Sequence, residues 1–370
     1  MIRPLLFSLA LLLAACGDSP TGCEPDCGPV GDEIVAGVNL TELYAAPRFA
    51  EIDAARDTLA AALGGRTVTP GLTVSPGDRE VISVLEGDRT EGGPVFTGTV
   101  RQPPREAGDQ RRRPLLVVLW DEPNLGLDRL IADLPLDESL LNEFVLLVVV
   151  RRGGSLQIGG TTVGTRPSAL DPFAPEHVGD ALALVEYVRQ RRETYGVREG
   201  AVGILGYGRG GTTGLNLRAI ADTEALTVAL AAPASFQLPS VRETTSAYLR
   251  GVAYDAFPGL NDVLALTAGE VRDGAATIDE ARVEGIVRSP ALLTEETAPG
   301  TRLYIAHGQR DTVVPEEHGR TIGAFAAPTG GGYLAPEEAT HESLPTNPEV
   351  RTIVRIGVCD TLLAGESVCD

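Results

Sequence analysis

Five short apolar runs without polar alternation recur along the chain after its first hundred residues. Strands that are covered on both faces have this composition, because neither face meets water. The runs are residues 115–120, 144–150, 201–205, 226–231 and 302–307. Segments with helical spacing accompany them at about residues 127–142, 176–194, 210–222 and 279–288. This alternation predicts a doubly wound, mostly parallel α/β sheet with helices on both faces.

The segments before the first of these runs follow other patterns. Residues 41–63 carry apolar positions at helical spacing, interrupted by Pro47 and ended by Gly64 and Gly65, and they predict a helical extension over residues 39–79. Two apolar runs at 81–86 and 95–101, separated by a polar turn, predict a hairpin. Residues 80–370 are then the α/β domain. Its excursion at about residues 236–282 is either a lid over the carboxyl edge of the sheet or a surface subdomain.

Residues 1–15 have the pattern of a cleavable signal peptide, with one basic residue, a short apolar stretch and small residues before Cys16. The stretch from Leu13 to Cys16 resembles the lipobox of bacterial lipoproteins. That resemblance implies a lipid on Cys16 and a chain anchored in the cell envelope outside the cytoplasm, with Gly17 favouring the outer membrane. An ordinary secretory signal is the alternative. Residues 16–38, rich in Gly, Pro and Asp, predict a solvated tether.

The remaining four cysteines lie in polar segments near the two ends of the chain, at Cys23, Cys27, Cys359 and Cys369. In an oxidising compartment such cysteines form disulfides. Three pairings are possible, and the two local ones, Cys23 with Cys27 and Cys359 with Cys369, need the least rearrangement of the chain. No metal-binding spacing is present among them.

The charge balance narrows the class of partner. A formal net charge of −20 over 370 residues excludes nucleic acid as a partner. After the signal segment, no apolar stretch is long enough to cross a membrane. The membrane contact that the sequence predicts is therefore the lipid on Cys16.

Two chemistries compete for the glycine-rich stretch that follows the run at 201–205. As GxGxxG, the residues Gly206, Gly208 and Gly211 fit a dinucleotide-binding turn, in which backbone N–H groups at a helix N-terminus receive a pyrophosphate. That arrangement needs an acidic residue at the end of the next strand, where the chain reads Leu-Ala-Ala-Pro instead. As GxSxG with Gly208 in place of serine, the stretch fits a nucleophile elbow.

The second interpretation extends to the rest of the chain. Residues from about 110 to 345 resemble α/β-hydrolases, most closely the prolyl oligopeptidase and dienelactone hydrolase branches, whose elbow often reads GxSxGG. The stretch from His307 to Pro315 resembles the HGxxDxxVP element of that branch, which implies that Asp311 is the acid of a triad. His341 follows thirty positions later, in the chain order nucleophile, acid, histidine. The plainer alternatives are that Asp311 is a turn residue without a catalytic role and that His341 is a loop residue without a partner.

The resemblance fails at the reacting positions. Gly208 carries no hydroxyl, and Thr212, Thr213 and Ser155 are poorly placed substitutes. Where the family commonly has an HGG-like turn that completes the oxyanion hole, this chain reads Trp120-Asp121-Glu-Pro, and carboxylates there would repel a developing oxyanion.

Four residues are candidates for the oxyanion and pocket region. Trp120 belongs either to the core or to a pocket, Arg209 is a solvated helix-start residue or an anion contact, and Tyr207 and Asp121 flank the elbow. Among the other histidines, His307 is expected to be structural, and His177 and His318 to lie on the surface. Glu337, Glu338 and His341 give too weak a pattern for a metal site.

These observations favour one function over two others. The leading hypothesis is a lipid-anchored α/β-hydrolase-fold protein that has lost its nucleophile and acts by binding an ester, peptide or glycan-derived ligand, without a cofactor. The first alternative is slow hydrolysis by a water that His341 and Asp311 activate. The second is nucleotide binding through GxGxxG.

Overall fold

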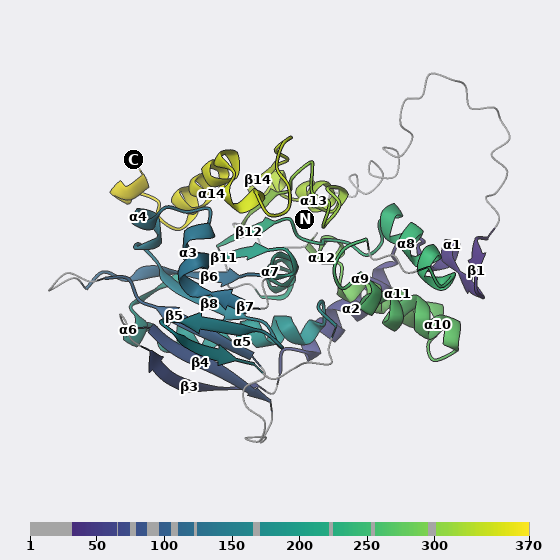
Figure 1. The fold of residues 1–370 in the computed structure, drawn as a ribbon, viewed down its shortest axis with the longest axis horizontal. Helices are drawn as coiled ribbons and strands as arrows, with labels where there is room; N and C mark the ends of the chain where they lie inside the picture. Colours follow the sequence, from purple (N-terminus) through teal and green to yellow (C-terminus); the bar gives the residue numbers. More distant parts are fainter. Residues whose placement is uncertain are drawn as a thin grey trace, which may run out of the picture.

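A computed structural model describes residues 32–64, 66–74, 79–86, 96–104, 110–121, 124–165, 171–221, 225–252, 256–294 and 301–369 (Figure 1). The predicted signal peptide, the lipidation site at Cys16, and Cys23 and Cys27 lie outside these residues. Within them, no helix combines the length and apolarity that a membrane span requires.

A sheet of nine strands forms the centre of the described structure, in the order β14-β13-β12-β11-β6-β8-β5-β4-β3. The strands from β8 to β14 run parallel, and β5, β4 and β3 are added antiparallel at one side. The bounds are β3 Arg66–Val74, β4 Arg79–Glu86, β5 Phe96–Arg101, β6 Arg113–Leu119, β8 Val145–Val150, β11 Val197–Tyr207, β12 Leu226–Leu230, β13 Arg302–Ala306 and β14 Gly332–Leu334. The fold is therefore the predicted doubly wound, mostly parallel α/β class.

Helices cover both faces of the sheet. On one face the core joins the sheet to α3 (Leu127–Asp133), α4 (Glu138–Leu141) and α14 (Pro348–Thr361). On the other it joins the sheet to α2 (Phe49–Ala61), α5 (Pro175–Gln190), α7 (Arg209–Ile220) and α11 (Ile278–Val287), with α6 at Arg192–Tyr195 following α5. Further elements on the second face and beside β14 are α12 (Pro290–Leu293), α13 (Glu317–Gly323) and a short turn at Ala327–Thr329. A short turn at Leu344–Thr346 joins the core of the first face. The strands β6, β8 and β12 are buried along their whole length, as their continuous apolar runs predict.

The smaller elements complete the connections. A separate three-stranded sheet contains β7 (Asn124–Gly126), β9 (Ser155–Ile158) and β10 (Thr161–Gly164). A two-stranded ribbon of β1 (Ile34–Val35) and β2 (Val38–Asn39) leads into α1 (Leu40–Leu43). The excursion after β12 contains α8 (Pro239–Leu249), α9 (Leu260–Leu264), a π-helical turn at Ala265–Gly269 and α10 (Glu270–Asp273) before α11.

The excursion packs on the segment that precedes the sheet, and the two lie together at one end of the molecule in Figure 1. A buried ion pair joins them, since Arg282 of α11 donates from Nε and Nη2 to the carboxylate of Glu51 in α2 at 2.7 and 2.9 Å. Arg282 also donates to backbone carbonyls of α1 and the turn after it. Hydrogen bonds from Arg282 hold the pKa of Glu51 well below its usual range. The excursion is therefore attached to the N-terminal helices, and not only to the sheet.

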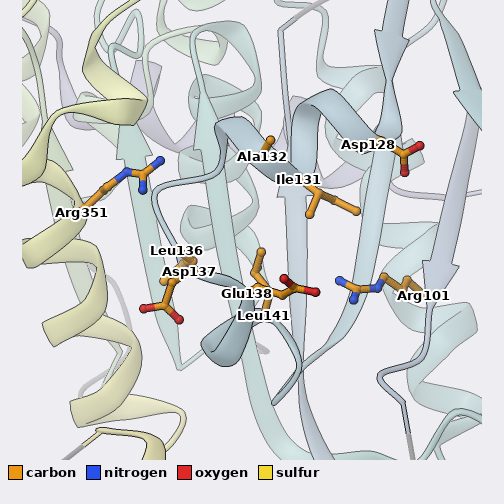
Figure 2. Close-up of a pocket in the computed structure, with 9 residues that line it drawn as sticks. All are labelled: Arg101, Asp128, Ile131, Ala132, Leu136, Asp137, Glu138, Leu141 and Arg351. Carbon is orange, nitrogen blue, oxygen red and sulfur yellow. The ribbon is translucent and has the colours of Figure 1, made fainter.

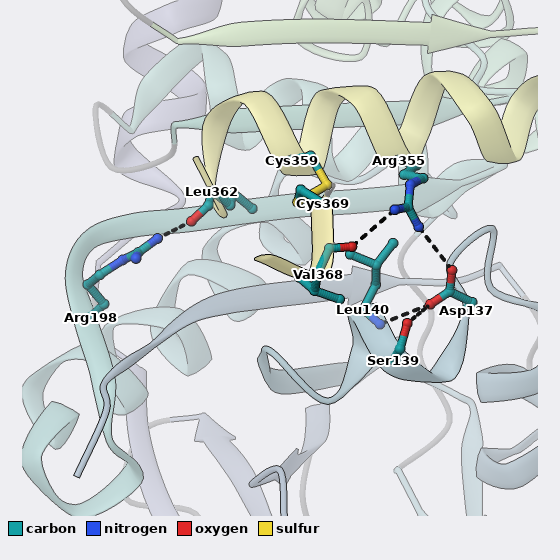
Figure 3. The surroundings of a disulfide bond; sticks show 9 residues. All are labelled: Asp137, Ser139, Leu140, Arg198, Arg355, Cys359, Leu362, Val368 and Cys369. Carbon is teal, nitrogen blue, oxygen red and sulfur yellow. Dashed lines mark hydrogen bonds and ion pairs between the residues drawn. A yellow bond between two sulfur atoms is a disulfide. The ribbon is translucent and has the colours of Figure 1, made fainter. Parts of the chain in front are cut away.

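A disulfide closes the C-terminal end of the described chain. Cys359 of α14 is bonded to Cys369 in the 3₁₀ turn Ser367–Cys369, which is the local pairing that the sequence favours (Figure 3). Arg355 of the same helix donates to the carbonyl of Val368 at 3.0 Å and pairs with Asp137 at the start of α4. The disulfide thus holds the end of the chain against the face of the sheet that α14 covers.

Most predicted elements coincide with observed ones within a few residues, and the hairpin is present as β4 and β5. The predicted helix over 127–142 is two short helices, because Pro135 lies between α3 and α4 and removes a backbone donor. Strand β3 was not predicted, since Pro70 and Gly71 interrupt its sequence. A register irregularity between Pro70 and Thr73 accommodates them in this edge strand.

Candidate functional site

The sheet changes its direction of growth between β6 and β11. From β6 the chain goes to β8 on one side, and from β8 it crosses to β11 on the other side of β6 and continues to β12, β13 and β14. In open α/β sheets, ligands bind outside the carboxyl ends of the strands at such a switch point. The carboxyl end of β6 leads into Trp120 and Asp121, and that of β11 leads into Gly208. Topology alone therefore brings these predicted site residues to one place.

The turn at Gly208 has the backbone geometry of a sharp strand-to-helix elbow. Its φ of +57° and ψ of −129° lie in a region that side-chain-bearing residues enter only with strain, and its N–H donates to the carbonyl of Leu230 at 2.9 Å. Glycine occupies this conformation freely.

The other glycines of the motif are explained by close packing. A Cβ on Gly206 would come within 2.6 Å of the Cα of Gly211, and one on Gly210 within 2.2 Å of the carbonyl oxygen of Leu119. Helix α7 therefore begins in direct backbone contact with the ends of β6 and β11. This packing accounts for the glycine pattern without a bound pyrophosphate.

The carboxylate of Asp121 occupies the space beside the elbow. A Cβ on Gly208 would lie 2.7 Å from Oδ2 of Asp121 and 3.0 Å from its Cβ. Nε of Arg209 donates to Oδ1 of Asp121 at 2.5 Å, and Nη1 of Arg151 lies 3.9 Å from the same oxygen. The side chains of Asp121 and Arg209 are 19% and 17% exposed, so the pair is only partly screened by water. A carboxylate held by an arginine therefore stands where a serine side chain would begin.

An acid and a histidine are paired close to the elbow. Nδ1 of His341 lies 2.8 Å from Oδ2 of Asp311, and the other oxygen of Asp311 accepts the N–H groups of Val313 and Val314, both at 2.8 Å. Burial alone would raise the pKa of Asp311, but the hydrogen bond and charge of His341 and the N–H of Val314 together hold it below its ordinary value. Asp311 is therefore an oriented carboxylate, which suits it to hold an imidazole in one tautomer.

Aromatic contacts join this pair to the elbow. The ring of Tyr207, directly before Gly208, lies 4.9 Å from that of His341 and 4.8 Å from that of Trp120, measured between centroids. The hydroxyl of Tyr207 donates to the carbonyl of His341 at 3.1 Å. The structure thus brings five predicted site residues, Trp120, Tyr207, Gly208, Asp311 and His341, into one cluster. Nε2 of His341 has no hydrogen-bond partner among the described residues.

The hydroxyl groups considered as substitutes for serine are engaged elsewhere. Thr212 donates to the carbonyl of Pro233 at 2.6 Å, and Thr213 to the carbonyl of Arg209 at 3.2 Å. Ser155 donates to Oδ1 of Asn124 at 2.8 Å in the three-stranded sheet. Each of these contacts uses the proton that a base would have to remove from a nucleophile.

Two histidines expected on the surface are buried, so that prediction is wrong. His177 is 7% exposed and His318 is fully buried. Nδ1 of His318 accepts the N–H of Ala234 at 3.1 Å, and burial lowers its pKa to about 3. Both residues have polar neighbours in the sequence, and nothing in the sequence indicates that other elements cover their helices. His307 is structural as predicted, with Nε2 donating to the carbonyl of Val314 at 2.9 Å and lying 3.5 Å from Asp311.

Sequence reasoning also missed Arg151 as a neighbour of the elbow. Arg151 directly follows β8, whose parallel pairing with β6 puts it at the same sheet edge as Trp120. The end of an apolar run was therefore a signal that could have identified it.

One cavity adjoins the site, and a larger one lies apart from it. A small one of about 30 Å³ adjoins the elbow and is lined by Trp120, Arg151, Arg209, Gly210 and other residues. A larger pocket of about 420 Å³ lies away from it, between α3, α4 and Arg351 of α14, and contains none of the predicted site residues (Figure 2). No group of three or more His, Cys, Asp or Glu side chains able to hold a metal occurs in the part of the chain that the structure describes.

Comparison with known proteins gives similarity in structure only. No family model and no curated protein sequence matches the chain. Solved structures that resemble it are α/β-hydrolase-fold enzymes, among them an acylaminoacyl peptidase complex (13% identity, TM-score 0.46, 78% of this chain and 40% of that one) and a puromycin-hydrolysing peptidase of Mycobacterium tuberculosis (15%, 0.48, 81% and 46%). An esterase of Pyrococcus furiosus resembles it at 14% identity and a TM-score of 0.46, over 82% of this chain and 96% of that one. The chain spans less than half the length of either peptidase.

Proposed function

We propose that this protein is a lipid-anchored, extracytoplasmic member of the hydrolase-fold class that binds its ligand and does not form an acyl-enzyme. The observation that carries the proposal is Gly208 at the elbow, with the Asp121 carboxylate 2.7 Å from where a serine Cβ would be. Removing the serine of a triad costs on the order of 10⁶ in turnover, because the covalent route is lost. The residue that fills the space is a carboxylate, which repels the oxyanion that acyl transfer generates.

The location rests on separate support. The first fifteen residues have the composition of a signal peptide, and Cys16 follows them in a lipobox-like context. Disulfides persist in oxidising compartments, and Cys359 is bonded to Cys369. Metabolic labelling with a radioactive fatty acid tests the anchor: incorporation that is lost on Cys16→Ser is expected, and wild-type protein without label would contradict it.

The sequence resemblance to hydrolases suggests the class of ligand. An ester, a peptide or a glycan-derived compound would enter at the carboxyl edge of the sheet, near Asp311 and His341. Retention of the 2.8 Å contact between these two residues supports a site that still orients a polar group.

A fluorophosphonate probe tests the central claim, because it modifies activated serine hydroxyls covalently. The purified wild-type chain is expected to remain unlabelled at concentrations that fully label an active serine hydrolase in the same tube. Intact-mass analysis decides the result. Labelling of any residue in the wild-type chain would show that a nucleophile exists and would overturn the proposal.

A second function is favoured by one observation, the unpartnered Nε2 of His341 beside an oriented Asp311 in the described part of the chain. In this alternative, His341 removes a proton from a water molecule that attacks an activated ester directly, so no covalent intermediate forms. Rates of p-nitrophenyl acetate hydrolysis by the wild type and by His341→Ala distinguish the two. Equal rates contradict the alternative, and a clear loss in His341→Ala supports it.

A further inference from the structure

Two guanidinium groups beside the elbow face one carboxylate among the residues that the structure describes. Arg209 begins α7 and donates from Nε to Asp121, whereas the closest approach of Arg151 to that carboxylate is 3.9 Å. In the part of the chain that the structure describes, the guanidinium of Arg151 makes no hydrogen bond, and its Nε is buried without a partner. A guanidinium carries five N–H donors, so most of the donors of this pair are unused.

Most of the unused donors belong to Arg151, whose charged form is disfavoured by burial. The side chain of Arg151 is only 26% exposed. Burial, and then the charge of Arg209, lowers the pKa of Arg151, while Asp121 opposes that shift. Charged groups taken from water are normally paired with an opposite charge and hydrogen-bonded. Among the described residues at this place, two positive charges face one negative charge, which leaves room for a second anion.

Both arginines border the same small cavity, which has a volume of about 30 Å³. That volume holds one or two water molecules, or the head group of a carboxylate. Gly210, in the first turn of the twelve-residue helix α7, also lines the cavity, and N–H groups of a first turn have no partner within the helix. His177 lines it too, is 7% exposed and has an Nδ1 without a partner among the described residues.

Apolar side chains make up much of the remaining wall, contributed by Phe96, Leu119, Trp120 and Val149. This composition favours the carboxylate end of an organic anion over a strongly hydrated inorganic ion, and the volume of the cavity admits only that end. A carboxylate also matches the planar fork of an arginine, which can bind both of its oxygens at once.

We propose that the cavity between Arg151, Arg209 and Trp120 is a binding subsite for the carboxylate group of an organic ligand. The inference rests on the proposed function, because it names the chemical group by which a ligand would be held beside the inactive elbow. Asp121 is the internal neighbour that keeps Arg209 oriented, and Arg151 supplies the donors for the ligand.

The single tryptophan of the chain, Trp120, lines this cavity and is 6% exposed, so its fluorescence reports occupancy. The purified full-length chain is titrated with propionate at constant ionic strength, and propionamide serves as the neutral control of the same shape. We expect a saturable fluorescence change with propionate and at least about tenfold weaker binding of propionamide, since charge-assisted hydrogen bonds to arginine are lost.

Two variants assign the effect to Arg151. Arg151→Met removes the guanidinium and retains an apolar stem, and propionate is expected to bind at least about tenfold more weakly. Arg320→Met is the matched control, because Arg320 is 70% exposed and belongs to a helix that does not line the cavity; its binding is expected to equal that of the wild type. Thermal unfolding shows whether each variant is folded.

Three results would overturn the inference: no saturable response of the wild type to propionate up to about 0.1 M, an equal response to propionamide, or unchanged affinity in folded Arg151→Met. If Arg151→Met does not fold, the comparison of propionate with propionamide on the wild type still decides. Fluorophosphonate labelling of the wild type would contradict the proposed function without affecting this result, so the two failures are distinguishable.

Discussion

Introducing a reactive serine at the elbow should require removal of Asp121 as well. Gly208→Ser introduces a side chain at φ +57°, which costs about 1–3 kcal/mol of backbone strain. Its Cβ would also approach three atoms of Asp121, at 2.7, 3.0 and 3.2 Å, so the side chain of Asp121, which Arg209 holds, must shift. Asp121→Gly removes all three contacts. The two substitutions are therefore expected to be coupled by about 0.5–3 kcal/mol, the double variant being more stable than the sum of the single effects predicts.

The cycle is measured by urea unfolding of the wild type, both single variants and the double variant, with fluorophosphonate labelling of each. Only the variant that combines Gly208→Ser with Asp121→Gly is expected to be labelled at an appreciable rate, because the introduced serine can then adopt the rotamer that faces His341. Adding His341→Ala should abolish that labelling. Asp121→Asn is the shape-matched control, since it removes the charge and keeps the bulk.

The reasoning is refuted by either of two results. Additive stability changes would mean that Asp121 does not restrict the space above Gly208. Equal labelling of Gly208→Ser with Asp121 present or replaced by glycine would mean that the carboxylate does not block the site. Labelling restored by Asp121→Asn as efficiently as by Asp121→Gly would assign the block to charge and not to volume.

Three further outcomes follow from the packing. Arg282→Met removes the buried partner of Glu51 and leaves its carboxylate only the exposed Arg48, so urea unfolding should show a loss of about 1.5–3 kcal/mol, the range for a hydrogen bond to a charged group. Arg272→Met breaks a largely exposed pair and should lose at most about 1 kcal/mol. Burial depresses the pKa of His318 to about 3, so the unfolded chain binds the proton first, and the free energy of unfolding falls as the pH decreases from about 6.5 towards 3. His318→Gln should show a shallower decline over that range. An unchanged slope would contradict His318 as its origin. Cys369→Ser removes the disulfide between residues 10 positions apart and should lower the free energy of unfolding by about 2–3 kcal/mol in the same assay. Reducing agent should then have no additional effect on the C-terminal segment.

Much of the fold was determined by local sequence signals. Continuous apolar runs predicted β6, β8, β11, β12 and β13, because strands buried on both faces have no need of polar positions. The resemblance of the motifs to those of α/β-hydrolases implied that Asp311 and His341 lie together, and the structure places Oδ2 of Asp311 2.8 Å from Nδ1 of His341. The side chain of Asn347 accepts the N–H groups of Glu349 and Val350 at the start of α14, which is a local capping signal of the same kind.

Only the tertiary structure decided what fills the space beside the elbow at Gly208. The sequence showed that Gly208 lacks a hydroxyl and that Asp121 ends the turn after β6, but not that their atoms would meet. That contact depends on the parallel register of β6 with β11, a long-range property to which no local pattern contributes. The same holds for Arg151, which reaches the elbow through the pairing of β8 with β6, and for His177 and His318, which are buried by elements distant in the sequence. Sequence periodicity records which side of an element is covered by apolar neighbours, whereas the encounter of charged groups depends on how strands from separate parts of the chain align.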